Sequence, residues 1–433
     1  MSNYSTLEHV LKEILQVVKP LQEDLQTRTR VIDELRRVIR SVESLRGAQV
    51  EPFGSFASDL FTRWADLDIS IDLLNSSCIS SAGKRRKQRL LAEIQKALIH
   101  MGGWRRLQYI PNARVPILKF ESSLQGISCD VSIDNLQGQI KSKILLWISA
   151  IDTRFRDMVL LVKEWAKAHD INNPKTGTFN SYSLSLLVIF HFQTCVPAIL
   201  PPLSDIYAGN IAGDLQDSWD LSFNMLHAGA RTSAERRIAE TCAANITRFR
   251  QQKFRPVNQS SLSELFISFL AKFSNISLRA SELGIFTYTG QWEYIRMRLL
   301  PKTYALFIED PFEQPENSAR AVSMSNLTKI SEAFQMTHHK LISANQNQGA
   351  LLAALVRQQV LRYIPRAPAW TPTDNGRHYH RYQHHPTRPQ VQRTLLSTTS
   401  RQFGNLRLDS QSSSSTLQNH NQGQHMWRAR SDR

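Results

Sequence analysis

The sequence predicts an α+β protein in which a small mixed domain is followed by a larger helical domain and a polar tail. Three observations support this class. Alternating β-branched runs such as "LDISIDLL" (67–74), typical of half-buried strands, are concentrated before residue 143. After that point, segments such as "RFRDMVLLVKEWAKAH" (154–169) repeat apolar residues at helical spacing. From about residue 366, aliphatic residues become sparse and Gln, Ser, Asn, His and Pro predominate.

The mixed domain is predicted to begin with helices and continue with strands. Residues 6–19 and 27–45 carry apolar stripes at helical spacing, and Pro20 ends the first helix. "VEPFGS" (50–55) indicates a strand running into a glycine turn, and 67–74 indicates the next strand. A helix is expected over 84–101. "WRRLQYI", "VPILKFE" and "GISCDVSID" then predict three short strands.

The second half is predicted to be helical. "NSYSLSLLVIFHFQTC" (180–195) is a long apolar helix, and "SSLSELFISFLAKFS" (260–274) starts with a capping box. In that box, Ser260 or Ser261 is followed three places later by Ser263 or Glu264. A last helix is expected over about 318–334, and a further one over 345–363.

Composition limits the functional classes. The chain has 433 residues and a formal net charge of +16, which favours a polyanionic partner such as nucleic acid; simple solubility is the alternative. The cysteines form no CxxC pair, which argues against zinc and disulfides and for a reducing compartment. They are Cys78, Cys129, Cys195 and Cys242. No apolar run reaches 18 residues and the N-terminus lacks a secretory pattern, so no membrane partner is expected.

The tail, 366–433, is expected to be disordered, because so few aliphatic residues cannot bury enough apolar surface to offset the ordering entropy. Residues 371–433 contain nine arginines and no lysine, so the tail either contacts RNA or a partner or is an inert solvated extension. The cluster "KRRK" (84–87) is either a solvated helix face or a nuclear localisation signal.

Acidic residues in strand-like segments provide the chemistry. Asp66 and Asp68 lie two places apart where aspartate is disfavoured, and on a strand their carboxylates would share one face and repel. Asp130 lies on a later strand that could pair beside the first. Gly54 and Ser55 form a turn whose backbone can approach a phosphate closely. Each feature alone is weak, but together they predict a site for two divalent ions, Mg²⁺ or Mn²⁺, that serves phosphoryl transfer.

These motifs resemble those of the DNA polymerase β-like nucleotidyltransferases, in the noncanonical poly(A) polymerase and terminal uridylyltransferase branch. "PFGSFASDLFTRWADLDISIDL" (52–73) carries the resemblance, which covers about 1–340. It continues through the central helices and through "YALFIEDPFEQPENSARAVS" (304–323), which is similar to the poly(A)-polymerase-associated segment. "GTFNSYSLSLLVIFHFQTCVPAILPPL" (177–203) and "DPFEQP" (310–315) are most similar to the plant enzymes that uridylate small RNAs.

The resemblance implies which residues bind metal and triphosphate. Asp66, Asp68 and Asp130 would be the catalytic, metal-binding triad, and Gly54 and Ser55 would hold the β- and γ-phosphates. The triphosphate would also be reached by two lysines one helical turn apart, Lys163 and Lys167. Without the resemblance, these two would simply be solvated lysines on an amphipathic helix.

The resemblance also implies which residues hold the γ-phosphate, ribose and base. Ser181 would touch the γ-phosphate, and Tyr182 would stack on the base, although a core tyrosine is the alternative. The remaining positions are Asn135 and Ser142 near the ribose and base, and Asp310 and Glu313 in the base-selecting loop.

Two positions depart from the family pattern. Lys141 stands where many relatives have an asparagine for the ribose hydroxyl, and Glu316 stands where a uridine-preferring branch has a base-selecting histidine. The expected choice of UTP therefore depends on the whole-chain resemblance. A noncanonical poly(A) polymerase that uses ATP is the alternative.

We therefore expect a template-independent terminal RNA uridylyltransferase that adds UMP from UTP to RNA 3′ ends. By resemblance, its substrates are unmethylated small RNAs (microRNA, siRNA) and RNA cleavage fragments, marked for degradation and met on Argonaute, in the nucleus and cytoplasm. A catalytically inactive RNA-binding scaffold is disfavoured by the intact aspartates, and a second-messenger synthase by the basic charge and the "DPFE" segment.

The expected domains follow from this assignment. They are an N-terminal helix packing on the helical domain (1–26), a nucleotidyltransferase domain (27–142), a helical central domain (143–340), an additional helix (341–365) and the tail (366–433). No separate RNA-recognition motif is visible in the sequence. RNA would therefore be held by the tail and by basic side chains, which are Arg36, Arg37, Lys84 to Lys87, Arg105 and Arg106.

Overall fold

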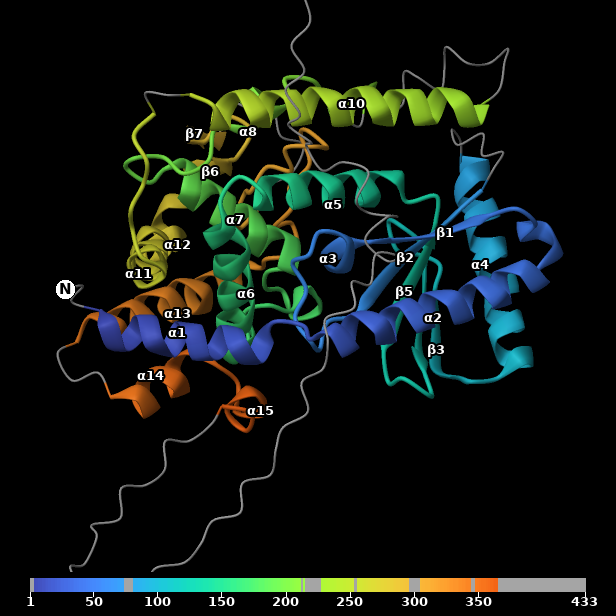
Figure 1. The fold of residues 1–433 in the computed structure, drawn as a ribbon, viewed down its shortest axis with the longest axis horizontal. Helices are drawn as coiled ribbons and strands as arrows, with labels where there is room; N and C mark the ends of the chain where they lie inside the picture. The colour runs from blue at the N-terminus through green and yellow to red at the C-terminus, as the bar shows by residue number, and fades with distance from the viewer. Residues whose placement is uncertain are drawn as a thin grey trace, which may run out of the picture. The chain divides into compact units, whose positions relative to one another are not determined.

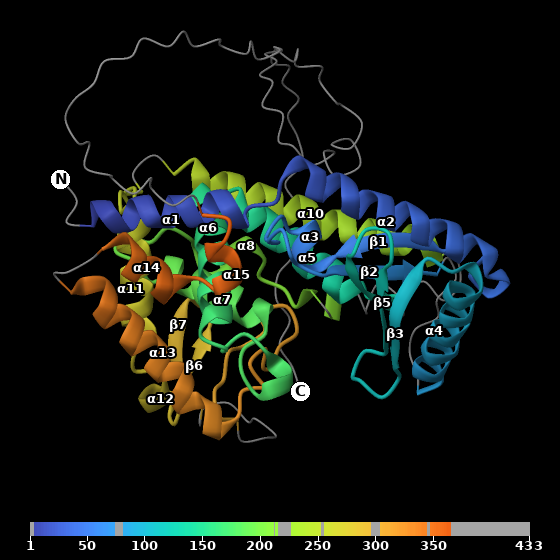
Figure 2. The ribbon, with the colours of Figure 1, turned by 90° about the horizontal axis from the view of Figure 1, so that it is seen from below.

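The structure is a computed structural model that describes residues 4–73, 81–211, 213–214, 227–252, 255–295, 304–343 and 347–364. The expected tail, 366–433, and Cys78 lie outside the described residues. The first 367 residues form one compact unit (Figures 1 and 2). No helix in the described part of the chain has the length and apolar character needed to cross a membrane.

A five-stranded mixed sheet forms the centre of the N-terminal part, with the strand order β1-β2-β5-β4-β3 (Figure 1). The strands are β1 (Gln49–Phe53), β2 (Leu67–Asp72), β3 (Trp104–Ile110), β4 (Ile117–Ser122) and β5 (Ser128–Ile133). β2 runs parallel to β5, and the other neighbouring pairs are antiparallel. The pairing of β2 with β5 brings together two strands that are far apart in the sequence.

Two long amphipathic helices, α2 (Gln22–Ser41) and α4 (Ser81–Met101), pack against each other and against this sheet. Their apolar stripes, which include Val31, Leu35 and Leu91, are buried with Ile69 of β2 and Val131 of β5 in one core. The short helix α3 (Gly54–Ala57) follows β1 directly, where the sequence predicts a glycine turn.

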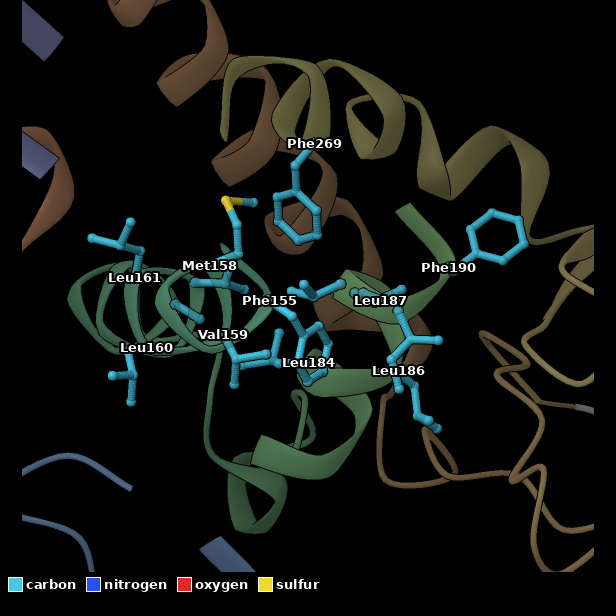
Figure 3. Close-up of a cluster of buried hydrophobic side chains, with 14 of the residues drawn as sticks. Phe155, Met158, Val159, Leu160, Leu161, Leu184, Leu186, Leu187, Phe190 and Phe269 are labelled. Carbon is cyan, nitrogen blue, oxygen red and sulfur yellow. The ribbon is translucent and has the colours of Figure 1, made fainter. Parts of the chain in front are cut away.

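A second and larger core is formed mainly by helices. Figure 3 shows its centre, where Phe155 and Met158 of α6 (Thr153–Ala168) lie near Leu184 of α7 (Ser181–Gln193) and Phe269 of α11 (Leu262–Phe273). The N-terminal helix α1 (Ser5–Val18) buries its apolar face in the same core. The other helices that the structure describes in this part are α5 (Leu136–Ser149), α8 (Leu203–Ile206), α10 (His227–Arg250), α12 (Ile276–Arg279), α13 (Met324–Ile342), α14 (Gln348–Leu355) and α15 (Gln358–Leu361).

The structure confirms the predicted α+β class and the capping box of α11, in which Glu264 N–H donates to Ser261 Oγ and Ser261 N–H donates to Glu264 Oε2. Several elements differ from expectation. The helix expected over 318–334 begins only at Met324, because Ser323 caps it. The helix expected over 345–363 is two short helices, α14 and α15. The hairpin of β6 (Leu283–Phe286) and β7 (Gln291–Tyr294) was not expected.

Helix α5 connects the two cores. It spans residues 136–149, across the expected domain boundary at 142/143, and its buried face, which includes Ile140 and Ile144, belongs to the larger core. Polar residues of the same helix face the sheet, so α5 contacts both the sheet domain and the larger core.

Candidate active site

The loop after β1 is built around Gly54. This residue has a positive φ of 67°, and a Cβ added to it would lie 2.1 Å from Asp68 Oδ2. Only glycine permits both the backbone conformation and the close approach. The Gly54 N–H donates to Ser142 Oγ at 2.7 Å, which fixes the loop to α5. Ser55 follows in α3 and is partly exposed.

The predicted acidic residues gather at this loop. Asp68 of β2 lies directly opposite Asp130 of β5 in the strand register. Asp66, expected to lie on the strand beside Asp68, instead precedes β2 and is exposed. Burial and the charges of Asp130 and Asp66 raise the pKa of Asp68 to about 7. Burial and Asp130 also raise the pKa of Asp66, so the three carboxylates lie close enough to repel one another.

One lysine partly offsets this repulsion. Lys119 lies opposite Asp130 in the neighbouring strand β4, and its ammonium group donates to Asp130 Oδ2. Among the residues that the structure describes, no three acidic, histidine or cysteine side chains stand arranged to hold a metal ion. The assignment of Asp66, Asp68 and Asp130 as metal ligands therefore stays a prediction, with Lys119 supplying the nearest positive charge.

A buried arginine that the sequence did not single out supports the segment before Asp66. Arg28 of α2 is fully buried, and its Nη2 donates to the carbonyls of Arg63, at 3.0 Å, and Ala65, at 2.6 Å. Its guanidinium also lies over the Phe61 ring, 5.0 Å from the centroid. The only sequence signal was an arginine among the core positions of an amphipathic helix.

The two predicted triphosphate lysines lie on the side of α6 that approaches the carboxylates. Lys163 is buried, and its Nζ donates to the Leu60 carbonyl at 2.8 Å. Burial and Lys167 lower the pKa of Lys163 to about 7, while Asp68 acts in the opposite direction. Burial also lowers the pKa of Lys167, and Asp66 again opposes the shift. The alternative that these residues are solvated lysines on an amphipathic helix is therefore wrong.

The start of α7 carries the predicted γ-phosphate and base-stacking residues. Ser181 Oγ accepts a hydrogen bond from Asn172 Nδ2 at 3.2 Å. The Tyr182 hydroxyl donates to Asp310 Oδ1 at 3.1 Å, and the Lys141 ammonium lies 5.4 Å from the centroid of the Tyr182 ring. Tyr182 is partly exposed and packs at the edge of the larger core. This position lies between the two alternatives, a base-stacking ring and a core tyrosine.

The predicted base-selecting residues form an ion-paired network. Lys141 Nζ donates to Asp310 Oδ2 at 2.6 Å and to Glu313 Oε1 at 2.8 Å. Arg114, from the turn between β3 and β4, donates to Glu313 Oε2 at 2.6 Å. Glu316 Oε2 lies 3.3 Å from Arg114 Nη1. Sequence reasoning missed Arg114, because nothing in its own turn marks it.

Asn135 and Ser142 make contacts within the protein. Asn135 caps α5, since its Oδ1 accepts from Gly138 N–H at 3.1 Å, and its Nδ2 donates to Ser132 Oγ at 3.3 Å. Ser142 holds Gly54, as described above. The structure therefore places Ser142 beside the glycine loop and Asn135 at the start of the same helix. Their predicted contacts with ribose and base stay predictions.

Part of the expected basic surface is already neutralised. Arg105 and Arg106 both donate to Glu121, Arg106 at 2.9 Å, and Arg36 pairs with Asp33 at 2.8 Å. Lys84, Arg85 and Arg86 at the start of α4 are exposed.

A mixed sheet that carries carboxylates on neighbouring strands, next to a glycine loop and facing a helical core, defines a nucleotidyltransferase of the polymerase β type. A family model described as "Poly(A) RNA polymerase, mitochondrial-like, central palm domain" matches residues 7–150. Protein HESO1 of Arabidopsis thaliana is 54% identical to the chain over 396 residues, which cover 90% of this chain and 75% of that protein. The chain belongs to the noncanonical poly(A) polymerase and terminal uridylyltransferase branch of these enzymes.

Solved structures share the fold. The mtPAP complex with ATPγS superposes with a TM-score of 0.62 at 20% identity, covering 81% of this chain and 72% of that one. The Cid1 poly(U) polymerase with bound MgGTP gives a TM-score of 0.61 at 21% identity, covering 82% of this chain and all of that one.

Proposed function

We propose that the chain is a template-independent terminal RNA uridylyltransferase that transfers UMP from UTP to the 3′ end of RNA. The observation that carries this proposal is the placement of Asp68 opposite Asp130, with Asp66 nearby and the Gly54 loop in contact with Asp68. Preference for UTP is supported by the sequence resemblance to plant small-RNA uridylyltransferases, and the chain is 54% identical to HESO1.

The donor chemistry of the acidic group suits divalent ions, Mg²⁺ or Mn²⁺. Asp66, Asp68 and Asp130 offer the hard oxygen donors that Mg²⁺ prefers, and their mutual repulsion, seen in the raised pKa of Asp68, is the arrangement that a cation relieves. Lys119 now supplies the counter-charge beside Asp130, and a bound cation would take over this role. Such ions, when bound, lower the barrier to phosphoryl transfer by stabilising charge on the attacking and leaving oxygens.

The protein itself binds and orients the nucleotide. The Gly54 backbone can lie against a phosphate because no side chain intervenes, and Ser142 holds that backbone in position. Lys163 and Lys167 supply positive potential beside the carboxylates, and a triphosphate would favour their charged forms against burial. The Tyr182 ring offers a flat surface on which a base can stack.

The proposed substrates are unmethylated small RNAs and cleavage fragments, met on Argonaute in the nucleus and cytoplasm and marked for degradation. A methyl group on the 2′-hydroxyl beside the attacking 3′-hydroxyl would clash with groups that orient the RNA end. Extension of a methylated RNA as fast as its unmethylated counterpart would contradict this part of the proposal.

The proposal is tested with purified full-length protein, an end-labelled unmodified RNA, Mg²⁺ and each of the four nucleoside triphosphates alone. Extension with UTP, abolished by Asp66→Ala and retained by the exposed control Asp205→Ala, is the expected result. Extension with ATP in place of UTP would assign the chain to the poly(A) polymerases. Absence of extension by folded protein would favour the RNA-binding scaffold.

A further inference from the structure

The C-terminal segment, residues 348–364, packs near the helix that carries the two predicted triphosphate lysines. Its helices α14 and α15 contact α1, and α14 also contacts α6 (Figures 1 and 2). Leu355 and Val360 are buried in the larger core. The Ala354 carbonyl lies 2.9 Å from Nε2 of His169, the residue that ends α6. The segment is therefore an additional element that belongs to the same core as α6.

A bidentate ion pair joins this segment to α6. Arg357 donates to Glu164 Oε1 from its backbone N–H at 3.1 Å and from Nε at 3.0 Å, and to Oε2 from Nη2 at 2.7 Å. The Glu164 side chain is 1% exposed and that of Arg357 is 27% exposed. A carboxylate this deeply buried is strongly destabilising when it is left unpaired. Both oxygens of Glu164 are thus engaged by one residue that lies 193 positions away in the chain.

The same segment also contacts the loop before Asp66. The Tyr363 ring lies 5.8 Å from the Trp64 ring, measured between centroids. The Arg63 guanidinium lies 5.9 Å from the centroid of each of these rings. The segment is therefore attached at two places, to α6 through Arg357 and to this loop through Tyr363, and these contacts fix the position of Arg357.

Glu164 is also a neighbour of Lys167, which lies three residues further along α6, and side chains at this spacing meet on one helix face. In the described part of the chain, Lys167 has no salt bridge. Burial and the charge of Arg357 lower the pKa of Lys167, whereas Glu164 and Asp66 raise it. Lys167 is thus a partly buried cation near the predicted metal ligands, and its acidic neighbour on α6 is occupied by Arg357.

Without Arg357, the buried Glu164 carboxylate would need another cation, and Lys167 is the cation one helical turn away. That pair would neutralise Lys167 and draw its ammonium group away from a triphosphate. With Arg357 in place, Glu164 is already paired. The second positive charge beside Lys167 then favours an anionic ligand at this point.

We propose that Arg357 is a positioning residue that holds Glu164 and thereby keeps the Lys167 ammonium group free for the β- and γ-phosphates of the incoming nucleotide. This inference rests on the proposed nucleotidyl transfer, in which Lys167 binds the triphosphate. Arg357 acts through Glu164 and does not itself touch the nucleotide. The C-terminal segment is then part of the triphosphate site, although it lies beyond about residue 340, where the family resemblance ends.

The test compares the full-length wild type with Arg357→Met in the extension of one unmodified RNA with UTP and Mg²⁺. The KM for UTP is expected to rise about 10-fold, the effect of one charged hydrogen bond, while kcat and the KM for RNA change less than about twofold. Loosened packing alone would lower kcat through the active fraction and leave the KM for UTP unchanged. Arg362→Met is the matched control, because Arg362 is exposed in the same segment and carries the same charge. It should keep the wild-type KM.

A double variant separates competition by Glu164 from a general loss of positive charge. Glu164→Gln combined with Arg357→Met leaves no carboxylate to pair with Lys167, so the KM for UTP should return to within about threefold of the wild type. A folded double variant whose KM stays as high as that of Arg357→Met would overturn the inference. If Arg357→Met does not fold, Arg357→Gln gives the decision, because its amide can still donate to Glu164. Its KM for UTP should rise severalfold, and an unchanged value would overturn the inference.

Calorimetric titration with UTP and Mg²⁺ distinguishes failure of this inference from failure of the proposed function. Arg357→Met should bind UTP about 10-fold more weakly than the wild type. Equal affinities of the two proteins would overturn the inference and leave nucleotidyl transfer intact. A wild type that binds UTP but extends no RNA would overturn the proposed function, and the titrations would still decide the role of Arg357.

Discussion

Two groups of acidic residues in this protein have opposite electrostatic environments. On the sheet, Asp68 and Asp130 lie opposite each other, and repulsion with burial raises the pKa of Asp68 to about 7. In the loop after β7, Asp310 and Glu313 are buried too, but Lys141 pairs with both. The comparison shows that the carboxylates of the first group repel one another, with Lys119 paired to Asp130. Those of the second group are already neutralised by ion pairs within the protein.

The largest expected effect is that of Asp68→Asn on activity. The rate of nucleotide addition should fall by several orders of magnitude, because an anionic oxygen ligand is lost. Thermal stability without metal should rise, because the amide has nearly the same shape and no longer repels Asp130 and Asp66. Added Mg²⁺ should stabilise the wild type more than the variant. Single-turnover extension and melting curves with EDTA or Mg²⁺ check this, and a lower melting temperature of the metal-free variant would contradict it.

The stability difference between the wild type and Asp68→Asn should depend on pH. The ordinary pKa of an aspartate is 3.8, and that of Asp68 in the folded protein is about 7, so folding favours the protonated form. Stability from this group is therefore present below about pH 4 and is lost as the pH rises towards 7. The metal-free wild type should become less stable relative to Asp68→Asn over this range. A difference in melting temperature that is constant with pH would show that Asp68 is not perturbed.

Gly54→Ala should have the next largest effect. The added Cβ would meet Asp68 Oδ2 at 2.1 Å on a residue with φ of 67°, so the loop must move away from the carboxylate. We expect about 100-fold lower activity, since misplacement of about 1 Å at a reacting centre has that effect. Gly126→Ala is the matched control, because Gly126 has φ of 65° with nothing within 4 Å of the added atom. This control should lose about 1–2 kcal/mol of stability to backbone strain and should keep near-normal activity.

Lys141→Met tests the ion-paired group of Asp310 and Glu313. It should lower stability, whereas Asp68→Asn should raise it. Removal of this cation leaves Asp310 and Glu313 buried with less compensation, so the free energy of unfolding should fall by about 2–4 kcal/mol. Lys143→Met is the control on the same helix, because Lys143 is 48% exposed and lies 3.6 Å from Glu235. Its effect should stay within about 0.5 kcal/mol. Denaturant titration measures the free energy of unfolding of both variants. Equal losses would show that Lys141 does not stabilise Asp310 and Glu313 as proposed.

Ser142→Ala should have the smallest effect. It removes the hydrogen bond from Gly54 N–H, which costs about 1 kcal/mol and should lower activity severalfold by loosening the loop. Ser149→Ala on the same helix removes only a bond to the Leu145 carbonyl and should leave nucleotide addition unchanged. Equal activities of the two variants would mean that Ser142 does not position the loop.

Local patterns predicted most of the fold. Alternation and helical spacing predicted the strands and the long helices, and the capping residues of α11 were recognisable because Ser261 and Glu264 act within one turn. The expected helix start at 318 was wrong, since residues 304–323 make backbone bridges to β6 and within their own loop that propensity does not reveal.

The sequence by itself determined which residues could carry the chemistry. The spacing of Asp66 and Asp68, the later Asp130 and the preceding Gly54 are local features, set by strand periodicity and by the freedom of glycine. Their contacts were not determined in this way. The pairing of Asp130 with Lys119, the support from Arg28 and the ion-paired network of Lys141, Glu313 and Arg114 were decided only by the tertiary structure. Arg28 and the network join segments that are distant in the chain, so their contacts depend on how the elements pack. The Lys119–Asp130 pair depends on the register of β4 with β5. No local pattern encodes either.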